Sequence, residues 1–236
     1  MKSNGKYIGL NQRIPFIVLN EAIRNLLEND KVDRAAIFQH MLDFTSGLNR
    51  ADKATKYVIQ ILSRQSHLLI AFKKGLKETS YENLSIADRK AFCLCLICLT
   101  YPIAFDLLVA LAQGFKVQNQ INKKFISEKV MSIYGSNRTV DIAIDALLPM
   151  IIEFNTIKRE KVSIYSLSTG LSTNNQFVTE LIIYTDVVLS RSKSILFEEI
   201  NVKPWYLYFN IAFQPENSRF LISFKESSKG KGYLVI

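Results

Sequence analysis

The sequence predicts a mainly α-helical fold. We expect an N-terminal helical bundle (residues 1–116), a central pair of helices followed by a short hairpin (117–170), and a small C-terminal part with a helix and antiparallel strands (171–236). Two patterns predict this. Apolar residues recur at helical spacing over much of the first 152 residues, and strand-like alternation occurs only in short segments after residue 155. Hydrophobic residues make up 48% of the chain, which is ample for a packed core.

The net charge indicates the kind of partner, and the number of cysteines indicates the cellular compartment. The formal net charge of +9 favours an anionic partner, either nucleic acid or a membrane surface. A basic protein without such a partner is the simpler alternative. The N-terminus is polar and lacks the pattern of a secretory signal. Three cysteines, an odd number, argue against a disulfide framework and for a reducing compartment, so we expect a cytoplasmic protein.

The N-terminal part is expected to begin with a helix over residues 14–29 and a second helix capped by Asp33. A third, long helix should start at Asp52 and continue to about residue 76. One of its faces is cationic, because residues 50–77 hold seven Lys or Arg and a single carboxylate. This face is either simply solvated or a surface that attracts DNA phosphates without reading sequence. The predicted phosphate contacts are Arg50, Lys53, Lys56 and Arg64.

Residues 91–115 form the most apolar run of the chain and have the length of a membrane span. Pro102 and Asp106 lie near the middle of this run, and a charge at that depth of a bilayer is costly. We therefore expect two buried helices, divided at Pro102, and no contact with a membrane. Three thiols lie in this segment, and we expect them to be buried hydrophobes and not metal ligands, because a zinc site needs four convergent ligands. They are Cys93, Cys95 and Cys98.

The central part has the pattern of two helices joined by a tight turn. A helix is expected over residues 125–134, followed by Gly135 and a longer helix that contains Pro149, where a kink or a break is expected. A short helix, a glycine-containing turn and a longer helix are typical of a helix-turn-helix. In that motif the start of the second helix meets the major groove of DNA. The predicted base contacts are Ser136, Asn137, Arg138 and Thr139.

A basic turn and a strand follow the longer helix. Residues 158–161 contain three cations, and residues 162–165 alternate as in a strand. Together with the preceding helices, this hairpin completes the pattern of a winged helix-turn-helix, whose wing would contact the DNA backbone. Such folds also serve as protein-binding or structural modules, since a fold alone does not fix a function. The predicted wing contacts are Lys158, Arg159 and Lys161.

The C-terminal part mixes helix and strand patterns. We expect a helix over residues 177–189, strands over 205–211 and 220–224, and a turn at 230–232 that leads into a last strand. The aromatic residues of the expected strands could stack nucleobases, but alternating strand aromatics more often belong to a core. They are Trp205, Tyr206, Tyr208, Phe209, Phe220 and Phe224.

The sequence contains no pattern that predicts catalysis. His40 and His67, the two histidines, lie on expected helices without a nearby acid or nucleophile in a shared motif. Asp141 and Asp145 share a helical face but lack a third ligand for magnesium. We expect a non-enzymatic protein that uses no cofactor and no metal.

Residues 49–168 resemble the BrxA family, small accessory proteins of bacterial BREX phage-exclusion systems. The resemblance is carried by the basic helix with Ile61-Leu62-Ser63-Arg64, by Asp88-Arg89-Lys90, by the apolar segment CLICLTYPIAFDLL and by the helix-turn-helix with its wing. It implies a helical cytoplasmic protein with a winged-helix part that binds double-stranded DNA in phage defence, with other defence-system proteins as further partners. The alternative is a scaffold subunit that binds a larger protein through the winged helix and the C-terminal sheet.

Overall fold

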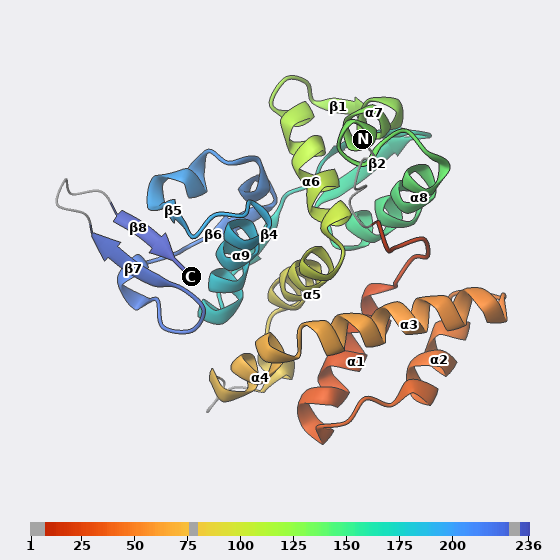
Figure 1. The fold of residues 1–236 in the computed structure, drawn as a ribbon, viewed down its shortest axis with the longest axis horizontal. Helices are drawn as coiled ribbons and strands as arrows, with labels where there is room; N and C mark the ends of the chain where they lie inside the picture. Colours follow the sequence, from red (N-terminus) through yellow and green to blue (C-terminus); the bar gives the residue numbers. More distant parts are fainter. Residues whose placement is uncertain (1–7, 76–79, 227–231) are drawn as a thin grey trace, which may run out of the picture.

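The computed structural model describes residues 8–75, 80–226 and 232–236 and shows a mainly helical chain with short strands in its second half (Figure 1). The predicted fold class is confirmed at this level. Lys77 and most of the turn expected at residues 230–232 lie outside the described residues. The helices are α1 (Phe16–Asn29), α2 (Arg34–Leu42), α3 (Leu48–Arg64), α4 (Ser66–Gly75), α5 (Ile86–Thr100), α6 (Pro102–Phe115), α7 (Lys123–Tyr134), α8 (Arg138–Glu153) and α9 (Gln176–Leu189).

Helix α5 is the centre of the molecule. It packs against α1, α3, α6, α9 and strand β4 (Leu171–Thr173), and its residues from Ala91 to Cys98 are all buried. The three cysteine thiols are among them, as predicted. Burial raises the pKa values of Cys93 and Cys95 to about 12, because the thiolate would lose its hydration.

The division between α5 and α6 is also confirmed. Pro102 occupies the first turn of α6, where its missing N–H costs nothing, and the two helix axes differ by 114°. In the described part of the chain no single helix is long and apolar enough to cross a membrane, although the bent pair α5–α6 would qualify by length and composition alone.

The long helix expected from Asp52 to about residue 76 is not continuous, so this prediction is wrong. The chain forms two helices, α3 and α4, which separate at Gln65. The backbone of Gln65 leaves helical geometry, and its buried amide Nε2 donates to Thr100 Oγ1 at 3.2 Å. This contact with the end of α5 holds the break in place, and a local sequence pattern contains no information about it.

The central part is a compact unit of three helices and a three-stranded sheet. Its elements follow the order α6, β1 (Gln120–Asn122), α7, α8, β2 (Ile157–Lys161) and β3 (Ile164–Leu167). The sheet is antiparallel with the order β1-β3-β2. Helix α6 approaches β1 closely at Gly114, where a Cβ atom would lie 2.4 Å from Ile121 Cδ1. Strand β1 was not expected from the sequence, since three residues are too few to show an alternation.

The C-terminal part is built on α9, which packs along α5. Figure 1 shows this part on the left, on the other side of α5 from the central unit. Strands β5 (Ser194–Leu196), β8 (Gly232–Val235) and β7 (Ser223–Glu226) form an antiparallel sheet, which was expected near the C-terminus. Strand β5 was not expected, and the strand expected over residues 220–224 begins only at Ser223. Strands β4 (Leu171–Thr173) and β6 (Phe209–Ile211) pair in parallel, which was not expected. The helix expected over residues 177–189 is confirmed by α9.

The strand expected over residues 205–211 is largely wrong. Residues Pro204–Tyr208 form a 3-10 helix, and only the last three residues of the expected segment are a strand. The aromatic side chains here belong to the core: Tyr208 is fully buried and donates to the Leu108 carbonyl oxygen at 2.6 Å. Trp205, Tyr206 and Phe209 are also buried, so this segment is no stacking platform.

A buried carboxylate attaches the C-terminal segment to α9. The Glu180 side chain is fully buried and accepts hydrogen bonds from four successive backbone N–H groups, those of residues 219–222, at 2.8–3.4 Å. Gln176 Nε2 donates to the same carboxylate at 3.0 Å. A second carboxylate, that of Asp88 on α5, holds the segment before α9 by accepting from the N–H groups of Asn174 and Asn175.

Candidate nucleic-acid interface

The turn between α7 and α8 is built as the sequence predicts. Gly135 adopts a positive φ of 86°, and Asn137 is the N-cap of α8. Its Oδ1 accepts from the N–H groups of Thr139 at 3.0 Å and Val140 at 3.2 Å. Asn137 therefore holds the start of α8, and Arg138 and Thr139 are the exposed side chains that this end of the helix presents. Ser136 is exposed as well, with its Oγ 3.7 Å from Met131 Sδ.

The rest of the exposed face of α8 is not basic. Asp145 is exposed but pairs with Lys123 at 2.5 Å, so part of its charge is neutralised within the protein. Ile142 is 40% exposed on the same helix. A kink or a break was expected at Pro149, and the break is absent, because α8 continues past Pro149 to Glu153 as one helix. Arg138 and Thr139 therefore lie in the first turn of α8, as expected from the sequence.

The basic residues of the hairpin lie on a strand and not at its tip, which corrects the expected basic turn. Lys158, Arg159 and Lys161 belong to β2 and are exposed, and a bulge interrupts the pairing with β3 between Arg159 and Lys161. The tip is formed by Val162 and by Ser163, which has a positive φ of 60°. The Ser163 carbonyl oxygen accepts from Lys123 N at 2.8 Å and so fixes the hairpin to the start of α7.

A groove separates the second half of α8 from β2. Arg159 lines it, together with Pro149, Ile152 and Arg13. Arg13 reaches this place from the N-terminal segment, where its Nη2 pairs with Glu153 Oε2 at 2.7 Å. Arg13 was not expected at this place, because Arg13 and Glu153 are 140 residues apart and no local pattern connects them.

Two further lysines of the central unit were missed. Lys124 and Lys129 are exposed on α7, the helix that precedes the turn. Cations at this place would suit phosphate in a helix-turn-helix, because the first helix of that motif crosses the DNA backbone. The sequence pattern of α7 does not single them out, and only their exposed position on the helix before the turn does.

The cationic face of α3 is partly neutralised. Lys56 pairs with Asp52 at 2.7 Å, and Arg34 of α2 pairs with the same carboxyl group at 2.6 Å. The hydrogen bond from Lys56 and the charge of Arg34 lower the pKa of Asp52. Arg50 and Lys53 are exposed on α3. Arg64 lies apart from them at the end of the helix, with its Nη1 3.5 Å from the Thr100 carbonyl oxygen.

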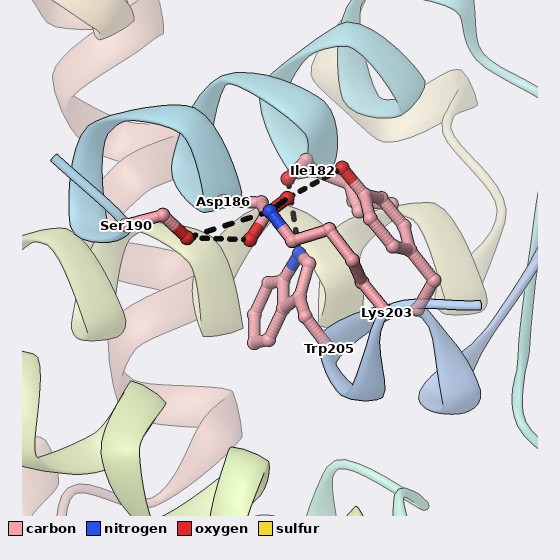
Figure 2. Close-up of polar contacts among 6 residues, drawn as sticks. Ile182, Asp186, Ser190, Lys203 and Trp205 are labelled. Atoms are coloured by element: carbon pink, nitrogen blue, oxygen red, sulfur yellow. Dashed lines mark hydrogen bonds and ion pairs between the residues drawn. The ribbon is translucent and has the colours of Figure 1, made fainter. Parts of the chain in front are cut away.

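A second polar cluster lies at the end of α9 (Figure 2). The buried carboxylate of Asp186 pairs with the Lys203 ammonium group and accepts from Tyr206 Oη at 3.1 Å and Ser190 Oγ at 3.0 Å. Trp205 Nε1 donates beside it to the Ile182 carbonyl oxygen at 3.0 Å. Lys203 Nζ also lies 3.5 Å from Ser190 Oγ. The cluster anchors the segment after residue 202 to α9.

Comparison with protein-family models, curated proteins and solved structures found no match for this chain.

Proposed function

We propose that the chain is a non-enzymatic double-stranded DNA-binding protein whose central unit is a winged helix-turn-helix. In this proposal α7 and α8 are the two helices of the motif, and β2 and β3 form the wing. The observation that supports the proposal is the element order α6-β1-α7-α8-β2-β3 with a β1-β3-β2 sheet, which is the order expected of a helix-turn-helix followed by an antiparallel hairpin.

The distribution of exposed cations supports DNA as the partner. Arg138 and Thr139 lie at the start of α8, where a recognition helix contacts base edges. The wing strand adds three exposed cations, Lys158, Arg159 and Lys161, which suit contacts to the phosphate backbone. Arg50 and Lys53 on α3 contribute sequence-independent attraction. The cytoplasmic location rests on the odd number of cysteines, which favours a reducing compartment, and on the resemblance of residues 49–168 to the BrxA family. The accessory role in bacterial phage defence rests on that resemblance alone.

Charge reversal on the wing tests this proposal. The double variant Arg159→Glu, Lys161→Glu should weaken binding to a DNA duplex by about two orders of magnitude, because two attractive phosphate contacts become repulsive. The matched control is Lys193→Glu with Lys225→Glu, two exposed lysines of the C-terminal part. Equal DNA affinity of the wing variant and the wild-type protein would refute the assignment of the wing.

Exposed apolar residues favour one alternative function, a scaffold that binds a larger protein. Ile133 and Ile142 are each about 40% exposed on α7 and α8, and Val162 is 78% exposed at the hairpin tip. Under this alternative, Val162→Asp would disrupt a complex that co-purifies with the protein, and the charge reversal on the wing would not. If only the charge-reversed variant lost DNA binding, protein binding would be excluded as the main role of this surface.

A further inference from the structure

The exposed surface of α8 is one narrow stripe that begins at the turn after α7. Most of the helix is buried, and its exposed residues are Arg138, Thr139, Ile142 and Asp145. Their spacing of one, three and three positions places them on a single helical face. A partner of α8 therefore meets these side chains and little else of the helix.

The polar residues of the turn are used within the protein, whereas the first cation of α8 is not. Asn137 Oδ1 accepts from two backbone N–H groups at the start of α8, and Ser136 Oγ lies 3.7 Å from Met131 Sδ. Arg138 is exposed and forms no ion pair with the part of the chain that the structure describes. Its guanidinium group is therefore available to a partner, and in the major groove such a group donates to both O6 and N7 of guanine.

Ile142 gives the stripe an apolar centre. It is 40% exposed one turn after Arg138, on a helix that is otherwise largely buried. The next exposed residue, Asp145, pairs with Lys123 at 2.5 Å, so the stripe ends in a neutralised pair. In the major groove the apolar group that a base presents is the C5 methyl group of thymine, which packs against apolar side chains. A single exposed isoleucine is ordinary on a protein surface, and what points to DNA is its place on the same face as Arg138.

We infer that α8 prefers a DNA site in which a thymine C5 methyl group packs against Ile142, close to a guanine that accepts from Arg138. Residues four positions apart on a helix are about 6 Å apart along its axis, and successive base pairs are about 3.4 Å apart. The guanine and the thymine therefore lie within about two base pairs of each other. This inference rests on the proposed DNA binding and adds a base preference to it.

Selection of duplexes from a random-sequence library, followed by replacement of single thymines with deoxyuridine, tests this preference. Deoxyuridine pairs with adenine as thymine does but lacks the C5 methyl group. In fluorescence anisotropy, one such replacement in the selected site should weaken binding to the wild-type protein by about fourfold, because the contact of one buried methyl group is lost. In Ile142→Ala the same replacement should change the affinity by less than about twofold, because alanine buries far less of the methyl group.

The matched control is Ile133→Ala. Ile133 is 41% exposed on α7, outside the stripe, so this variant should keep the fourfold difference between thymine and deoxyuridine that is expected of the wild-type protein. Circular dichroism spectra of both variants verify that they are folded.

The possible results separate this inference from the proposed function. If the protein binds a random-sequence duplex but no thymine of the selected site is sensitive to replacement, the base preference is overturned and the DNA binding stands. An equal effect of deoxyuridine in the wild-type protein and in Ile142→Ala would overturn the role of Ile142. Absence of binding to any duplex at low salt would refute the proposed function, and this inference with it.

Discussion

The substitution Glu180→Gln tests how the C-terminal segment is held. Glu180 is fully buried, and its two carboxylate oxygens accept from the N–H groups of residues 219–222 and from Gln176 Nε2. Glutamine has nearly the same shape but carries an NH₂ group in place of one oxygen. If the glutamine oxygen takes the Oε2 position, it still accepts from the N–H groups of residues 220–222. Its NH₂ group then faces the N–H of Arg219 and Nε2 of Gln176, so these two donors lose their acceptor.

The expected cost follows from these contacts. Two hydrogen bonds to a charged group are lost, each worth about 1.5–3 kcal/mol, and the remaining ones become neutral and weaker. Removing a buried charge recovers part of its desolvation energy. We expect the free energy of unfolding to fall by about 3 kcal/mol, which for a chain of this length lowers Tm by roughly 6–12 °C.

Urea and thermal unfolding measure this change, and amide hydrogen exchange localises it. Exchange at residues 219–222 should accelerate in the variant, with little change in α5. Glu216→Gln is the matched control, because Glu216 is exposed in the same segment and should change the unfolding free energy by less than about 0.5 kcal/mol. A loss below about 1 kcal/mol for Glu180→Gln would refute the idea that this carboxylate anchors the segment.

Three further predictions concern the core and the candidate interface. Asp186→Asn should lower the unfolding free energy by about 3 kcal/mol in urea denaturation, because Lys203 loses its charged partner in a poorly solvated site; an unchanged midpoint would contradict this. Asn137→Ala should cost about 1 kcal/mol in the same assay, since two N–H groups at the start of α8 lose their cap. The thiols should resist iodoacetamide at pH 8 until the protein is unfolded. Alkylation of the folded protein by iodoacetamide would contradict the burial of the thiols. The pKa values of Cys93 and Cys95 are raised from 9.0 to about 12, so the folded state holds more protons than the unfolded state above pH 9. The unfolding free energy should therefore fall as the pH rises from 9 to about 12.

The elements that the sequence predicted correctly depend on local chemistry. Pro102 divides the apolar run, Asp33 caps α2, and Gly135 makes the turn before α8. Each of these effects involves residues within a few positions of one another. For the same reason the end of α7 and the start of α8 were placed almost to the residue.

The errors involve contacts between residues far apart in the chain. The break at Gln65 is held by Thr100, and Tyr208 is fixed in a 3-10 helix whose aromatic side chains enter the core beside α6. The basic residues after α8 were expected in a turn, but β3 pairs with them and moves the turn to residues 162–163. Arg13 could not have been assigned to the groove beside β2, since its partner Glu153 is distant in sequence.

The central proposal is tested most directly by fluorescence anisotropy of a short random-sequence DNA duplex titrated with the protein across a series of salt concentrations. If Arg138 and the cations of β2 and α3 neutralise about five phosphates, log Kobs should fall linearly with log salt with a slope of about −4.5. The affinity should then decrease by nearly three orders of magnitude between about 50 and 200 mM salt. Absence of binding at the lowest salt concentration would contradict the proposal that this protein binds DNA.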